Sequence, residues 1–191
     1  ISTCDTRCMG GRCFLVTKNP DGSFSKTIGP ECTDNFQIVE NGFEFNGRLW
    51  HSVEQAFQAL KFPSESIARS EIFATGPKAH ESDEDYGLRV WQLGQYREDS
   101  TMRQDWQENK VKVMLLLNIA KYASEKDFQN QLLETIGQGI EALPSTSNWT
   151  YWNSKIQLSI RELLIEGKDL AVVLEELSIS SSREISEFLE N

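Results

Sequence analysis

The clearest hydrophobic pattern in the chain lies in WHSVEQAFQALKF, residues 50–62. Apolar residues recur at i, i+3, i+4 and i+7 between Val53 and Leu60, which is the pattern of one buried helix face. Ser52 followed three residues later by Gln55 has the spacing of a capping box, which marks a helix N-terminus. We therefore expect a helix that starts at Ser52.

Strand patterns precede this helix, and helical patterns follow it. Short apolar runs flank the turn sequence NPDG and predict a hairpin over residues 12–28. Asn-Gly turns at 41–42 and 46–47 predict further short strands. The later periodicity predicts helices at about 65–74, 77–95, 101–122, 125–135, 154–166 and 169–178.

The chain shows no internal repeat and no sign of a second domain. We expect one domain over 1–178, with a β-rich part at 1–50 and a helical part at 51–178. The stretch SISSSR, 178–183, indicates a hinge before a short acidic tail at 179–191. The predicted fold class is α+β, mainly α-helical, with a small N-terminal β-hairpin or sheet.

Composition narrows the class of protein. The 191 residues are 39% hydrophobic and 25% charged, which is typical of a folded soluble domain. The net charge of −10 argues against a non-specific nucleic-acid binder, which needs a basic surface. Acidic residues are concentrated from Glu166 onward, so the sequence is compatible with a local basic pocket elsewhere in the chain. No apolar run reaches 18 residues, so we expect no membrane partner.

The four cysteines all lie in the first 32 residues. The spacing C-x3-C-x4-C is not a usual zinc pattern, and both histidines are distant in sequence, so we predict no metal site. Two disulfides in a secreted form stay open as an alternative, but free thiols are the favoured interpretation. The residues concerned are Cys4, Cys8, Cys13 and Cys32.

A row of polar residues lies on the other face of the helix at 50–62. Glu54, Gln58 and Lys61 fall at i, i+4 and i+7. One interpretation is a solvated face stabilised by its charges. The other is a site, because a carboxylate beside a cleft stabilises positive charge, and a lysine binds phosphate or acts as a nucleophile when its pKa is lowered. The residues alone leave both open.

Standard catalytic motifs do not compete with this row. The sequence contains no GxSxG, HExxH, Walker loop or GxGxxG. We interpret His51 and His80 as surface residues.

The same stretch resembles the signature of the NADAR family (YbiA-like proteins), which reads roughly W-x-S-x-E-H-x-F-Q-A-x-K-F. The match includes Trp50, Ser52, Glu54, Gln58 and Lys61. The resemblance spans about residues 32–165. Its further matches are Asn35-Phe36, Gly94, Arg103, Trp106, Lys110, Met114, Ala120-Lys121-Tyr122, Leu132-Leu133, Thr135, Glu141 and Tyr151-Trp152.

The chain also departs from the family pattern. Gln55 stands where the family has His, and the family's Asp falls near Asn148 or Trp149. The Gly-rich segment of relatives is reduced to NSKIQLS, residues 153–159. An insertion around 79–92 has no clear counterpart.

The resemblance implies an N-glycosidase that cleaves a bond between a ribose C1 and nitrogen and needs no cofactor. It implies that Glu54 stabilises charge near C1 and shuttles a proton, and that Lys61 forms a Schiff base with C1. Lys110 would pair with pyrophosphate; the alternative for it is a solvated charge on a helix. Trp106 and Trp152 would stack on a base; the alternative for each is packing in the core. The remaining implied ligand-binding residues are Asn35, Trp50, Ser52, Gln58 and Glu141.

Three functions stay open. The first, which we favour, is removal of ADP-ribose from ADP-ribosylated guanine in DNA or RNA, and the second is cleavage of a riboflavin-pathway intermediate. The third is a non-catalytic ADP-ribose sensor, which the reduced Gly-rich segment favours, whereas the intact polar row favours an enzyme. We expect an ADP-ribose-containing partner and a cytoplasmic or nuclear location. The sequence does not define the oligomeric state.

Overall fold

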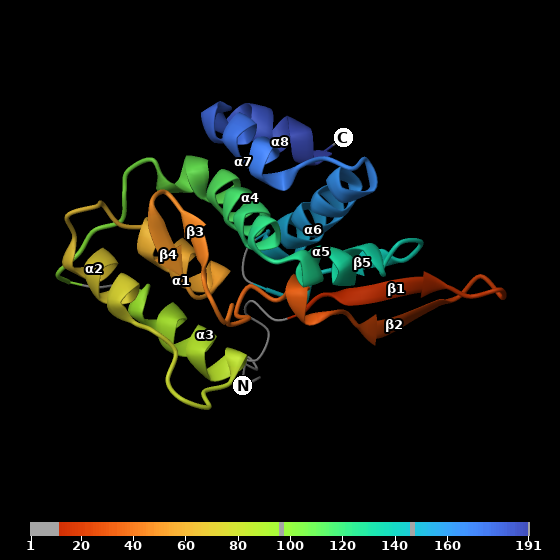
Figure 1. The fold of residues 1–191 in the computed structure, drawn as a ribbon, viewed down its shortest axis with the longest axis horizontal. Coiled ribbons are helices and arrows are strands. Elements are labelled where there is room, and N and C mark those ends of the chain that lie inside the picture. Colours follow the sequence, from red (N-terminus) through yellow and green to blue (C-terminus); the bar gives the residue numbers. More distant parts are fainter. Residues whose placement is uncertain (1–11, 96–97, 146–147, 191) are drawn as a thin grey trace.

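The computed structural model describes residues 12–95, 98–145 and 148–190. A long central helix, α4 (Trp106–Ser124), organises the fold (Figure 1). It packs against α1, α5, α6, α7, α8 and β3, so most of the other elements are built around it. The mainly helical α+β class predicted from the sequence is confirmed.

Two small antiparallel sheets accompany the helices. The strand order of the first is β2-β1-β5, and the second pairs β3 with β4. The predicted hairpin at NPDG is confirmed: Asn19 N donates to Ser23 O at 2.8 Å, and Gly22 takes the positive φ of 84° that the turn needs. The strands are β1 (Phe14–Lys18), β2 (Phe24–Ile28), β3 (Phe43–Phe45), β4 (Arg48–Trp50) and β5 (Gly139–Glu141).

Helix α1 (Val53–Leu60) begins as the capping box predicts. The Ser52 side chain accepts a hydrogen bond from Gln55 N at 3.1 Å. All eight residues of α1 are buried, because α2 (Ile67–Ala74), α3 (Asp83–Leu93) and α4 pack around it. The remaining helices are the 3-10 helix η2 (Glu31–Thr33), α5 (Lys126–Leu133), α6 (Trp149–Ile165), α7 (Leu170–Ile179) and α8 (Ser182–Glu190).

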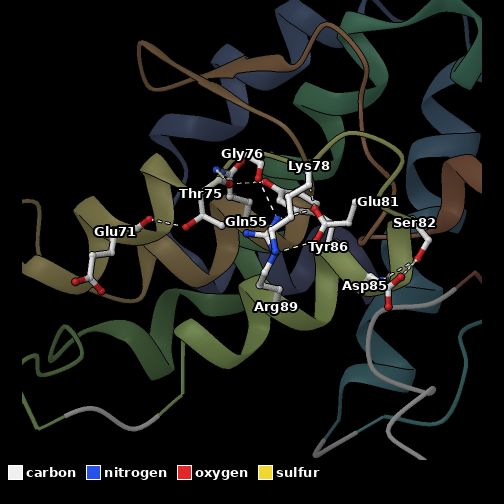
Figure 2. Close-up of polar contacts among 10 residues, drawn as sticks. All are labelled: Gln55, Glu71, Thr75, Gly76, Lys78, Glu81, Ser82, Asp85, Tyr86 and Arg89. Carbon is white, nitrogen blue, oxygen red and sulfur yellow. Dashed lines mark hydrogen bonds and ion pairs between the residues drawn. The ribbon is translucent and has the colours of Figure 1, made fainter.

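Helix α3 is shorter than the predicted 77–95, because a fixed loop occupies residues 75–82 (Figure 2). Tyr86 OH donates to Thr75 O at 2.9 Å, and Arg89 donates to Gly76 O at 3.0 Å and pairs with Glu81 at 2.6 Å. Since these contacts give the carbonyls of Thr75 and Gly76 hydrogen-bond donors without helical structure, α3 begins only after Ser82, whose side chain accepts from Asp85 N.

The C-terminal segment differs from the expected acidic tail. Residues from Ser182 to Glu190 form α8, and Ile185 and Leu189 are buried where α8 packs on α4 and α6. Its charged residues occupy the opposite face, which explains the acidic composition. In the described part of the chain, no helix combines the length and apolar character needed to cross a bilayer.

Candidate active site

A cavity of about 290 Å³ opens beside the polar face of α1. Side chains from α1, α3, α4 and α6 line it, together with Asn35 from the loop after η2. Six of the residues singled out in the sequence line this cavity: Asn35, Glu54, Gln58, Lys61, Trp106 and Lys110.

The central feature is a connected row along α1. Gln58 Nε2 donates to Glu54 Oε1 at 2.5 Å, while Gln58 Oε1 accepts from Lys61 Nζ. One amide therefore joins an acid to an amine through its two ends. Glu54 is 6% exposed and Gln58 2%, so this row is not a solvated helix face.

Burial moves both ionisable groups toward their neutral forms. Desolvation raises the pKa of Glu54, although the Gln58 hydrogen bond and the Lys61 charge oppose this. Desolvation also lowers the pKa of Lys61, against the opposing charge of Glu54. A carboxyl that can hold a proton and an amine that can lose one thus lie in the same cavity.

Two neighbours fix the position of this row. Lys61 Nζ also lies 3.5 Å from Gly94 O, and a Cβ at Gly94 would lie only 1.9 Å from Gln58 Oε1. Asn35 is tied to the start of α1, since its carbonyl accepts from Glu54 N at 2.9 Å. The C-terminus of α3 and the loop after η2 therefore hold the row from two sides.

Aromatic rings form an apolar wall of the cavity. The centroid of the Phe57 ring lies 4.9 Å from that of Trp106 and 5.3 Å from that of Trp149. Lys61 Nζ lies 5.8 Å from the centroid of the Phe57 ring. Lys110 also lines the cavity, and its Nζ donates to Gln107 Oε1 at 2.9 Å. The cavity thus combines an apolar wall of mutually inclined aromatic rings with the side chains of two lysines.

Four residues assigned to ligand binding by resemblance lie outside the residues that line the cavity. Trp50 is in the core, where its Nε1 donates to Phe45 O at 3.1 Å, and Ser52 caps α1. Glu141 on β5 pairs with Lys26 at 2.6 Å. Trp152 packs against the hydrophobic core and lies 5.0 Å from the Tyr151 ring. Their positions give them structural contacts instead.

Sequence reasoning missed two residues on α6. Trp149 and Asn153 line the cavity one helical turn apart. The predicted helix begins at 154, whereas α6 begins at Trp149 and so includes both residues. The segment 153–159, which the resemblance read from the sequence aligns with a Gly-rich loop, is helical and brings Asn153 to the cavity. The other lining residues not singled out as ligands are Phe57, Trp91, Gln95, Met102, Gln107, Met114 and Ser145.

Gln55, which replaces the family's His, has a structural role. Its Nε2 donates to the carbonyls of Ile72, Phe73 and Thr75 at 3.1 to 3.2 Å, which satisfies the C-terminus of α2 (Figure 2 shows the link to Thr75). Its Oε1 accepts from His51 N at 2.8 Å. Gln55 therefore supports α1 from the side away from the cavity.

The two described cysteines do not line the cavity. Cys13 and Cys32 are free and buried, and burial raises the pKa of the Cys13 thiol to about 12. Cys4 and Cys8 lie outside the described residues. Among the residues that the structure describes, no group of three or more His, Cys, Asp or Glu could hold a metal ion.

The fold and cavity define a small α+β protein with a cavity between its helices, which an acid and an amine line together. The model of the NADAR domain matches residues 13–161, so the chain belongs to the NADAR family. This family is associated with N-glycosidase activity. The resemblance read from the sequence is thereby confirmed.

A solved structure supports the same fold. The NMR structure of the E. coli protein YbiA matches with a TM-score of 0.56 and 21% sequence identity. The match covers 72% of this chain and 79% of that one. A comparison with curated proteins finds no match.

Proposed function

We propose that this protein is an N-glycosidase that removes ADP-ribose from ADP-ribosylated guanine bases in nucleic acid. One observation carries the proposal: Gln58 joins Glu54 and Lys61 in a single cavity while burial shifts both groups toward neutrality. Family membership supports the reaction class, because the family is associated with cleavage of N-glycosidic bonds.

The residues suit a two-stage reaction through an imine. Protonated Glu54 gives its proton to the ring oxygen as the C1–O bond breaks, and the exocyclic nitrogen of guanine forms a double bond to C1. Neutral Lys61 then adds to C1 and releases the guanine amine, which leaves a Schiff base on Lys61. Water hydrolyses this imine, so that ADP-ribose leaves and the amine is restored.

The rest of the cavity suits a nucleotide. The wall of Phe57, Trp106 and Trp149 offers apolar surface to a planar base, and Lys110 offers a cation to pyrophosphate. The acidic chain does not conflict with a nucleic-acid substrate, because a single flipped base can be read in a pocket.

The test is incubation of the protein with an ADP-ribosylated guanine oligonucleotide, with release followed by mass spectrometry. We expect free ADP-ribose and the unmodified oligonucleotide. Parallel reactions contain riboflavin-pathway intermediates. Cleavage of only these would reassign the substrate, and binding of ADP-ribose without any cleavage would make the protein a sensor.

A further inference from the structure

A chain of buried amides leads from the cavity into the protein interior. Asn35 at the cavity contacts Asn118 of α4, and Gln157 of α6 then links Asn118 to Tyr122 of α4. Asn118 and Tyr122 are 0% exposed and Gln157 is 1% exposed. Since buried polar groups are costly unless satisfied, the direction of each hydrogen bond in this chain is constrained.

The orientation of Asn118 is fixed by the backbone. Its Nδ2 lies 3.0 Å from Met114 O, a carbonyl that can only accept. The opposite orientation would place two oxygens together. Asn118 therefore presents Nδ2 to Asn35 Oδ1 at 3.1 Å, and presents Oδ1 to Gln157 Nε2 at 3.1 Å.

The far end of the chain agrees with this direction. Because Gln157 uses Nε2 toward Asn118, its Oε1 faces Tyr122 OH, which donates to it at 2.6 Å. Cys32 O lies 2.9 Å from the same hydroxyl and also accepts from Lys121 Nζ at 2.7 Å. The hydroxyl has one proton, which it gives to Gln157 Oε1 at the shorter distance, while Cys32 O is satisfied by Lys121 Nζ.

The consequence appears at the cavity. With its Oδ1 engaged by Asn118, Asn35 keeps its Nδ2 for the other side. Among the residues that the structure describes, that NH2 group has only a long contact, 3.5 Å to Asn153 Oδ1. Asn35 also accepts from Glu54 N through its backbone carbonyl, and both residues line the same cavity.

We propose that Asn35 is a specificity residue that donates a hydrogen bond to an acceptor-only oxygen of the ligand, and that Asn118 and Gln157 are positioning residues that impose this direction. The oxygen belongs either to the pentose ring or to a phosphate ester, neither of which carries a proton to donate. The inference rests on the proposed function only for the identity of the ligand.

Asn35→Asp tests the donor directly. A carboxylate still accepts from Asn118, so the variant changes only the group that faces the ligand. We expect ADP-ribose affinity, measured by calorimetry, to fall by about tenfold or more, because an acceptor then faces an acceptor. Gln95→Glu is the control, since it adds the same charge to the cavity lining at a side chain that donates to Trp91 O and belongs to neither the amide chain nor the Lys110 pair; its loss should be several-fold smaller.

Two variants of Asn118 test the positioning role. Asn118→Leu removes the donor to Asn35 and should weaken ADP-ribose binding about fivefold or more. Asn118→Asp at pH 5, where burial favours a protonated carboxyl, supplies an O–H donor and should recover most of this loss. A merely structural role gives no such recovery. Ribose 5-phosphate and inorganic phosphate, run with wild type and Asn35→Asp, distinguish a sugar oxygen from a phosphate oxygen as the acceptor.

The proposal is overturned if Asn35→Asp binds as tightly as wild type, if it loses no more affinity than Gln95→Glu, or if Asn118→Asp at pH 5 is as weak as Asn118→Leu. If wild type does not bind ADP-ribose, the proposed function fails but the amide direction is still tested. NMR of the ligand-free protein should then show slow exchange for the Asn118 NH2 protons and faster exchange for those of Asn35. The reverse order would contradict the inference.

Discussion

At the scale of single residues, the site depends on how Gln58 uses its amide. Its nitrogen end requires an acceptor in Glu54, and its oxygen end requires a donor in Lys61. A glutamate or an apolar residue at 58 meets only one of these needs or neither. Gln58 therefore sets the distance and the charge balance between the two reactive groups.

Glu54 should be essential for turnover. Glu54→Gln keeps the shape of the side chain but removes its proton-shuttling carboxyl, and we expect kcat to fall by at least about a hundredfold, the contribution of one general acid. The measurement is the rate of ADP-ribose release by a variant whose circular dichroism matches that of wild type. Glu44→Gln, on the exposed side of β3, is the control and should keep full activity. A folded Glu54→Gln protein with near-normal turnover would exclude Glu54 from the reaction.

The pH dependence of kcat/KM should be bell-shaped. The active form, with Glu54 protonated and Lys61 neutral, holds one proton on the pair, so turnover falls at low pH when the pair takes up a second proton and at high pH when it loses its last. The acidic limb therefore follows the pKa of Glu54 and the basic limb that of Lys61. Because burial raises the pKa of Glu54 and lowers that of Lys61, the plateau should be narrower than the interval between their ordinary values of 4.5 and 10.5. Gln58→Met removes the hydrogen bond that lowers the pKa of Glu54, so the acidic limb should move to higher pH. Movement to lower pH would contradict this account.

At the scale of elements, α1 was the part of the site most accessible to sequence reasoning. Its periodicity and capping box predicted the helix, and the spacing of the polar row predicted which side chains share a face. Whether that face was solvated could not be predicted, because the elements that bury it come from residues far away in the chain. The contribution of α6 was missed for a similar reason: packing on the core extends that helix through residues that favour loops.

The end of α3 should be as sensitive as the reactive residues. A methyl group at Gly94 would overlap Gln58 Oε1, so Gly94→Ala must displace the amide that joins Glu54 to Lys61. We expect kcat/KM to fall by about tenfold or more, as misplacement of reactive groups does. Gly76→Ala is the matched control, since its new methyl group would meet nothing closer than His51 Nε2 at 3.9 Å. Equal activity of the two variants would show that Gly94 does not hold the site.

At the scale of the whole molecule, the domain is completed by its C-terminal helices. The sequence predicted a tail after 178, because the short Ser-rich stretch resembles a hinge and the following charges resemble a solvated end. The pairing of Ile185 with Leu189 at i, i+4 was the available signal of a buried helix face. Only the packing on α4 shows that this segment belongs to the core.

Stability should therefore depend on α8. Ile185→Ala removes a fully buried side chain from the contact of α8 with the core and should lower the free energy of unfolding by about 2–4 kcal/mol. Ile179→Ala, at a residue that is 90% exposed, should change it by no more than about 0.5 kcal/mol. Urea denaturation measures both. If Ile185→Ala is as stable as Ile179→Ala, α8 is not part of the cooperative fold.

The central claim is that Glu54 and Lys61 act together on one sugar carbon in this cavity. The most direct test is to add borohydride while the protein turns over an ADP-ribosylated guanine oligonucleotide, and to map any covalent adduct by peptide mass spectrometry. The account predicts an ADP-ribose adduct on the peptide that contains Lys61, and no adduct or turnover in Lys61→Arg, because the guanidinium stays protonated. An active Lys61→Arg protein, with no adduct trapped in wild type, would contradict it.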